Sequence, residues 1–213
     1  QAAAQDLVPL AEQAQVLGRK FDAVVANPPY MGSKGMSFAL KNYLRIQYAG
    51  FDNDLFSAFM IQNLYLAKPS GQCGFMSPFV WMFISSYADL RAYFIDSSTL
   101  TSLVQLEYSG FDGATVPICT FTLNKQHMSQ FVGSFVRLSS FKGSDQQGPK
   151  TLEAIKNNSC GWFHLAKPDD FKKISGSPFA YWASDSIFRA FDSGKTVGRL
   201  GKLGKGSDTG KNE

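Results

Sequence analysis

"FDAVVANPPY", residues Phe21–Tyr30, joins a short apolar stretch to an asparagine, two prolines and an aromatic residue. The small apolar residues at 23–26 predict a strand that is buried on both faces, as in a parallel sheet. Ligands of open α/β sheets bind beyond the carboxyl ends of such strands, so the residues after the strand lie where a site is expected. This stretch therefore predicts both the fold class and the place of the chemistry.

Strand and helix patterns alternate around this stretch. Helices are expected at residues 3–17 (or only from Pro9, since proline suits a first turn), 54–67 and 85–96, and strands at 71–78, 101–108 and 117–125. This alternation predicts a doubly wound α/β sheet of parallel strands with a final antiparallel, hairpin-like pair. The first domain is expected to span residues 1–125.

The pattern changes after Asn124. A separate strand is expected at 131–138, and short helices at 151–158, 167–174 and, as a helix or an extended piece, 177–191. Residues 126–193 are thus predicted to form a small α+β extension. Residues 194–213 are rich in glycine and lysine and are predicted to be a linker, whose lysines contact phosphates or form a solvated tail.

The composition excludes several classes of protein. The net charge of +4 and the pI near 8.9 permit a polyanionic partner without requiring one. The three cysteines lie far apart with only two histidines to help, which predicts reduced thiols in the cytoplasm and no metal site. No apolar run is long enough for a membrane span. The first residue is Gln1, and we expect a fragment of a larger protein.

The Asn-Pro-Pro-Tyr segment can present two acceptors side by side. Proline has no backbone donor and a fixed φ, so the Asn27 amide oxygen and the Pro28 carbonyl are held on a stiff segment with Pro29. Two such acceptors suit an amine with two N–H groups, such as adenine N6, and Tyr30 offers a flat face for the base. A base in a duplex reaches such a pocket only when it is flipped out. The alternative is a rigid turn without function.

Several stretches resemble a known family. "FDAVVANPPY" resembles the catalytic motif of the amino-group DNA methyltransferases that use S-adenosylmethionine, in their γ arrangement. "NPPYMGSKGM", "DLFSAFMIQNLYLAKPSGQCGFMSPFVWMFISSYADLRAYF", "GFDGATVPICTFTLNK" and "ISGSPFAYW" are similar to the PglX family of adenine-specific methyltransferases in BREX phage-defence systems. The resemblance runs from about Phe21 to the C-terminus.

The resemblance implies a fold and a set of site residues. The fold would be the C-terminal half of a Rossmann-like class I methyltransferase sheet, with the linker leading to a target-recognition domain. Asn27, Pro28, Pro29 and Tyr30 would be catalytic, with the target adenine between Tyr30 and Phe111, and Asp54, Leu55 and Phe56 would line S-adenosylmethionine. Phe111 as a loop aromatic and Phe56 as a core residue remain the alternatives.

The Gly-rich turn that cradles the methyl donor in such enzymes is missing. A single glycine, Gly18, precedes Asn27, and "FVGSF" at 131–135 lacks the further glycine that a cradle needs. We therefore expect the chain to keep the base pocket and one edge of the donor pocket, and not to methylate by itself. The whole protein would methylate adenine N6 in double-stranded DNA for phage defence or restriction-modification.

Two other functions are compatible with the sequence. The same motif occurs in methyltransferases that act on glutamine amides of proteins, whose nucleophile is also an NH2 group. A non-catalytic module that binds DNA or other defence-system proteins would equally lack a donor cradle. No Ser-His-Asp, Cys-His or paired-carboxylate site is indicated, because His127 and His164 have no suitable neighbours in sequence.

Overall fold

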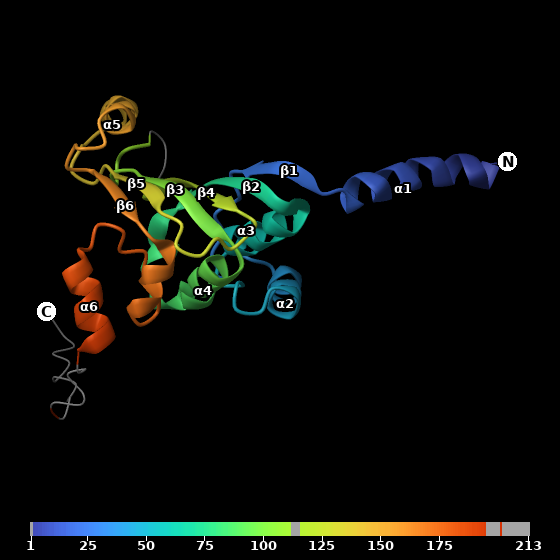
Figure 1. Ribbon diagram of the computed structural model, residues 1–213. Coiled ribbons are helices and arrows are strands. Elements are labelled where there is room, and N and C mark those ends of the chain that lie inside the picture. The colour runs from blue at the N-terminus through green and yellow to red at the C-terminus, as the bar shows by residue number, and fades with distance from the viewer. Residues whose placement is uncertain (1, 112–115, 195–200, 202–213) are drawn as a thin grey trace, which may run out of the picture.

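The computed structural model describes residues 2–111, 116–194 and 201, and Figure 1 shows the arrangement of their helices and strands. In chain order the elements are α1 (Ala2–Gly18), β1 (Phe21–Ala26), α2 (Phe38–Gln47), α3 (Leu55–Leu66), β2 (Ala67–Pro78), the 3₁₀ helices η1 (Phe79–Met82) and η2 (Ser85–Tyr87), α4 (Ala88–Ser97), β3 (Thr99–Gln105), β4 (Ile118–Asn124), β5 (Gly133–Arg137), α5 (Ser144–Lys156), β6 (Phe163–Ala166), the 3₁₀ helix η3 (Pro168–Lys173) and α6 (Asp185–Ser193).

A mixed six-stranded sheet forms the centre of the protein, in the order β1-β2-β4-β3-β5-β6. β1 is parallel to β2, with Val24 opposite Cys73, and β3 is parallel to β5. β4 lies between β2 and β3 and is antiparallel to both, so β1, β2 and β3 point the same way. The predicted α/β sheet of parallel strands with an antiparallel hairpin strand is confirmed, and the loops after β1, β2 and β3 leave it at one edge.

The main hydrophobic core lies between the sheet and the helices α3 and α4, which cover one of its faces (Figure 1). α3 is apolar on almost all sides and buries Phe56, Met60 and Ile61. Trp81, in η1, is fully buried, with its ring against those of Phe94 and Phe121. The segment after β2 is therefore part of the core.

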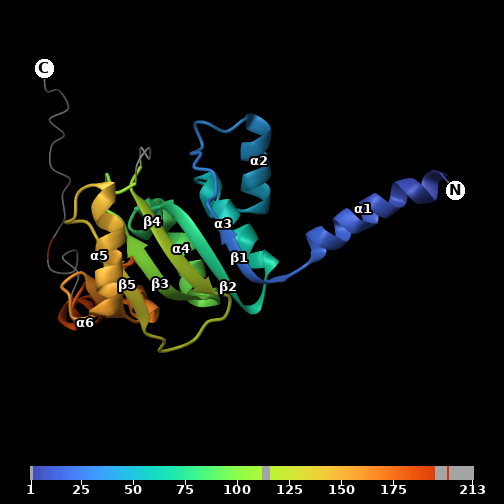
Figure 2. The same cartoon turned by 90° about the horizontal axis from the view of Figure 1, so that it is seen from above.

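The opposite face of the sheet is only partly covered. α5 lies over it at the β5 end (Figure 2), where Ala154 packs with Val136 and Leu138 in a smaller core. Over β1, β2, β4 and β3 the same face is a shallow concavity of about 350 Å³. Val25 on β1 is 83% exposed there. α1 projects away from the sheet in both views, with Leu7, Leu10 and Leu17 exposed.

Several predicted elements differ in extent from the observed ones. α1 runs from Ala2 and continues through Pro9, so a start at Pro9 was wrong. α5 begins at Ser144, ahead of the predicted 151–158. Of the stretch 177–191, residues from Asp185 onward are helical, because the preceding residues are drawn into the core by the buried Phe179 and Tyr181. α2 was not predicted at all.

The strand expected to be separate is part of the same sheet. β5 pairs with β3 from Ser102↔Ser134 to Gln105↔Arg137, and β6 pairs with β5. The predicted boundary near residue 125 thus falls between two strands of one sheet. The division into 1–125, 126–193 and 194–213 stays a prediction, and most of 194–213 lies outside the described residues.

Candidate functional site

Asn27–Tyr30 follows β1 directly and lies at the edge of the sheet where β1, β2 and β3 end. The Tyr30 hydroxyl donates a hydrogen bond to the Asn27 amide oxygen at 2.9 Å. Pro28 is buried, Pro29 is exposed, and Tyr30 is 38% exposed. Burial raises the pKa of Tyr30, so the phenol stays protonated and remains a donor at neutral pH. The motif is thus a fixed corner with one side of its tyrosine open.

Asp54 fastens this corner to α3. Its carboxylate accepts hydrogen bonds from the backbone N–H of Met31 at 2.9 Å and from that of Phe56 at 3.3 Å, which caps the helix. The Leu55 N–H donates back to the Met31 carbonyl at 3.0 Å. Burial raises the pKa of Asp54, and the backbone N–H donors oppose that rise. Asp54 therefore positions the loop after Tyr30 as well as α3.

Phe56 forms a second aromatic layer under Tyr30. The two rings meet edge-on with centroids 6.5 Å apart, and Phe56 is 1% exposed. Its other side stacks on Tyr87, with centroids 5.5 Å apart and an interplanar angle of 25°. The neighbouring Leu55 packs against the small core that joins α2 to α3. Leu55 and Phe56, two of the three residues predicted to line the donor, thus have packing roles.

Tyr87 lies in a segment beside the candidate site that was not predicted from the sequence to take part in it. The segment 79–87 follows β2. Among the polar contacts that hold it, the Arg91 guanidinium donates to the Trp81 and Ile84 carbonyls at 2.6 and 2.8 Å, and Asn53 donates to the Ser86 carbonyl at 2.5 Å. Burial, and then the charge of Asp54, raise the pKa of Tyr87 to about 12. The sequence signal that could have identified Tyr87 is the presence of an aromatic residue after β2, the second of the parallel strands.

Phe111 lies in the loop that leaves β3 at the same edge of the sheet. The ring is 48% exposed, and the turn before it is closed by the Gly110 N–H on the Glu107 carbonyl at 2.9 Å. Residues 112–115, the middle of "GFDGATVP", lie outside the described residues. The topology puts Phe111 and Tyr30 at one edge, and their sandwich of a base stays a prediction.

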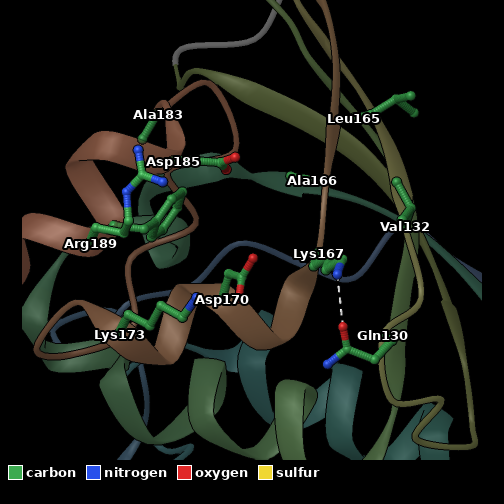
Figure 3. A pocket seen from close by; sticks show the side chains of 11 residues that line it. Gln130, Val132, Leu165, Ala166, Lys167, Asp170, Lys173, Ala183, Asp185 and Arg189 are labelled. Atoms are coloured by element: carbon green, nitrogen blue, oxygen red, sulfur yellow. Dashed lines mark hydrogen bonds and ion pairs between the residues drawn. The ribbon is translucent and has the colours of Figure 1, made fainter. Parts of the chain in front are cut away.

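A cavity of about 510 Å³ lies at the other end of the sheet, between β6, η3 and α6 (Figure 3). Its charges are mixed: Lys173 pairs with Asp170 at 2.8 Å, and Arg189 and Asp185 also line it. Lys167 donates to Gln130 at 2.7 Å. β1 and β6 are opposite edges of the sheet, so this cavity is separate from Asn27. The concavity beside β1, by contrast, has Asn27 in its lining.

In the described part of the chain, no group of three or more His, Cys, Asp or Glu residues could hold a metal ion. Likewise, none of the helices described is long and apolar enough to cross a membrane.

The chain is similar in sequence to known methyltransferases. Residues 6–111 match the model of the Eco57I restriction-modification methylase family. The chain is 35% identical to the adenine-specific methyltransferase BrxX of Escherichia coli O9:H4 (strain HS) over 192 aligned residues, which are 89% of this chain. It is 32% identical over 173 residues, 80% of the chain, to the adenine-specific methyltransferase PglX of Lacticaseibacillus casei (strain Zhang). The match covers 15% and 14% of the length of these relatives.

Solved structures share the fold. The methyltransferase subunit of a type I restriction-modification system from Streptococcus thermophilus aligns with a TM-score of 0.59 at 18% identity, over 79% of this chain and 39% of that one. The Type ISP restriction-modification enzyme LlaGI, solved as a nuclease-deletion mutant with a DNA substrate mimic, aligns with a TM-score of 0.58 at 13% identity, over 83% of this chain and 16% of that one. The sequence resemblance is confirmed: this chain is a homologue of the PglX and BrxX family of adenine-specific methyltransferases and corresponds to a limited stretch of their length.

Proposed function

We propose that this chain forms the target-base part of a DNA methyltransferase that transfers a methyl group from S-adenosylmethionine to adenine N6. The observation that carries the proposal is the Asn27–Tyr30 corner, held at the carboxyl end of β1 by Asp54, in a chain homologous to adenine-specific methyltransferases. Restriction-modification is supported by the Eco57I family match, and DNA as the substrate by fold neighbours solved with DNA. The role in phage defence and the flipped adenine in double-stranded DNA rest on the sequence resemblance alone.

The corner can hold an amine by two hydrogen bonds. The N6 group would donate one N–H to the Asn27 amide oxygen and the other to the Pro28 carbonyl. An amide oxygen has two lone pairs, so Asn27 can accept from the amine while it still accepts from the Tyr30 hydroxyl at 2.9 Å. Two such bonds favour a more tetrahedral nitrogen, whose lone pair is then free to react.

Tyr30 and Phe111 would hold the base plane. Tyr30 is supported from below by Phe56 and Tyr87, so its ring has a fixed backing against which a purine can stack. Phe111 would cover the second face of the purine. Stacking on these rings offsets the cost of extruding the base from the duplex.

The donor supplies an electrophilic methyl group on a sulfonium. The amine nitrogen would form the new N–CH3 bond, the S–CH3 bonding pair would stay on the departing sulfur, and the methylated nitrogen would pass one proton to water. Of the residues predicted to border the donor, the Asp54 carboxylate accepts backbone N–H groups while Leu55 and Phe56 pack inside. The assignment of these residues to one edge of the donor pocket rests on the sequence resemblance, and we expect the 213-residue chain alone not to methylate DNA.

The test is made in cells that carry the natural gene. Asn27→Ala should remove N6-methyladenine from its target sites in genomic DNA, as read by nucleoside mass spectrometry, while protein abundance is unchanged. Asn158→Ala, an exposed asparagine beyond α5, is the matched control and should leave methylation intact. Undiminished methylation in Asn27→Ala would refute the proposal. Methylated glutamine in a host protein, lost in the same variant, would favour a protein methyltransferase instead.

A further inference from the structure

The outward face of α2 combines an aromatic residue with two cations. Phe38, Lys41, Asn42 and Arg45 recur at intervals of three and four residues, which places them on one side of the helix. With Ser33 and Asp52 they line a small cavity of about 200 Å³. Phe38 is 87% exposed, an unusual position for a phenylalanine of a helix whose other face is packed.

We infer that this face of α2 is a DNA contact surface beside the target-base loop (Asn27–Tyr30), with Lys41 and Arg45 on phosphates and Phe38 against the exposed face of a neighbouring base. The inference rests on the proposed function and deepens it, since it names the surface that holds the duplex next to the extruded adenine. Neither the composition nor the family resemblance predicted a role for α2.

α2 is held rigidly enough to serve this purpose. Leu44 is buried against Met36 and Ala58, in a small core between α2 and α3. The Ser37 hydroxyl caps the first turn by accepting from the Leu40 N–H at 3.2 Å. Tyr48, at the end of α2, donates to Gln62 of α3 at 2.8 Å. The helix thus stands beyond α3, away from the sheet (Figure 2), with its direction fixed by α3.

The charge on this face is complementary to a phosphate backbone. α2 contains Lys41 and Arg45 and no acidic residue. Within the part of the chain that the structure describes, neither cation forms a salt bridge. Asp52 is the single carboxylate in the lining of this cavity, whereas the larger cavity at β6 contains two carboxylates. Arginine and lysine at such a surface bind phosphate oxygens whatever the sequence.

The surface lies within reach of the target-base loop. Ser33, at the rim of the cavity, follows Tyr30 by three residues, so their Cα atoms are at most about 11 Å apart even for extended chain. The bridge between Gly32 and Asp54 holds this connection in place. A DNA strand whose extruded base stacks on Tyr30 would therefore have its flanking phosphates next to α2.

Phe38 gives the surface an apolar element that phosphate binding does not need. When a base leaves the stack, its neighbours expose their faces, and inserted apolar side chains commonly fill that space. The contribution of such a ring is independent of salt, because no counterion is released. Cation and aromatic contributions to DNA affinity are therefore separable by experiment.

The experiment measures the affinity of the 213-residue chain and its variants for a fluorescein-labelled duplex, by fluorescence anisotropy, between about 50 and about 200 mM salt. Lys41→Gln with Arg45→Gln should lower the slope of log affinity against log salt by about two. Phe38→Ala should weaken binding about tenfold with an unchanged slope. The matched controls are Lys142→Gln with Lys156→Gln, which removes two exposed cations around α5, and Phe191→Ala, an exposed aromatic of α6.

Each outcome decides a different point. An unchanged slope in the Lys41/Arg45 variant, or an equal drop in the Lys142/Lys156 control, overturns the α2 surface and leaves the base site at Asn27 untouched. A wild-type chain that binds no DNA at the lowest salt overturns the surface too. Failure of the methylation test, with α2-dependent binding intact, would instead reject the proposed reaction. Circular dichroism of each variant confirms that the fold is kept.

Discussion

The Asp54 carboxylate and the Met31 backbone N–H, 23 residues apart in the chain, are joined by a hydrogen bond of 2.9 Å. The same oxygen caps α3 through Phe56, so one side chain fixes both the helix and the loop that follows the Asn-Pro-Pro-Tyr motif. The geometry of the candidate site therefore depends on a residue that need not touch the base.

Replacing Asp54 by alanine should cost about 1–2 kcal/mol of unfolding free energy, measured by urea titration, because the cap and the loop contact are lost together. Asp54→Asn keeps an acceptor and should cost less. In hydrogen exchange, the Met31 amide should exchange faster in Asp54→Ala. Ser37→Ala, which uncaps α2 instead, is the control and should leave Met31 protected. Equal Met31 protection in both variants would contradict this role.

Phe56 and Tyr30 should separate stability from function. Phe56→Ala removes a side chain that is 1% exposed and should cost about 3–5 kcal/mol of unfolding free energy. Tyr30→Ala alters a surface residue and should cost about 1 kcal/mol or less, yet abolish methylation by the natural protein. A stability loss as large in Tyr30→Ala as in Phe56→Ala would show that Tyr30 belongs to the core.

Arg91 should be a strong stability determinant although it lies outside the site. It is buried and donates to three backbone carbonyls, those of Trp81, Ile84 and Gly176. Arg91→Met keeps much of the side-chain volume but leaves these carbonyls without a donor, and should cost about 3 kcal/mol in urea unfolding. Arg189→Met, on α6, is the control, expected within about 0.5 kcal/mol of wild type.

His164 should make stability depend on pH. Burial, and then the charge of Arg137, lower the pKa of His164 below its ordinary value of 6.5. The unfolded chain then binds a proton at His164 more readily than the folded protein does. His164 therefore has no effect on stability well above its pKa in the unfolded chain, and it lowers the free energy of unfolding as pH falls through that pKa. The unfolding midpoint should drop between about pH 7 and about pH 5, and drop less in His164→Gln. Identical pH profiles would exclude His164 as the cause.

Much of the fold is visible in the sequence because its signals are local. Asp54 is a capping residue before an apolar helix, and the apolar run at 23–26 predicts a strand, which is observed as β1. The prediction that this strand is buried on both faces is wrong, because β1 is the edge of the sheet and Val25 is 83% exposed. The neighbours of β5 are not predictable in this way. Gly133 faces the Leu100 carbonyl so closely that a Cβ atom would lie 2.9 Å from that oxygen, a tertiary contact that no local pattern encodes.

The candidate site was predictable in part. Asn27–Tyr30 could be identified from its two prolines, which make the motif stiff. The fastening of Met31 to Asp54 and the backing of Phe56 by Tyr87 join separate segments, and only the fold brings them together. α2 did have a local signal, since Ser37 precedes Leu40 and Leu44 at helical spacing, but glycines just before it favoured a loop.

The Arg91 guanidinium works as a non-covalent staple between early and late parts of the chain. Gly176, 85 residues downstream, is joined through it to the segment beside the target-base loop. An insertion or deletion between these residues that displaced Gly176 would pull on the peptide groups of Trp81 and Ile84. Length changes in relatives should therefore cluster away from the two ends of this staple, and a graft of the candidate site into another scaffold would have to include both.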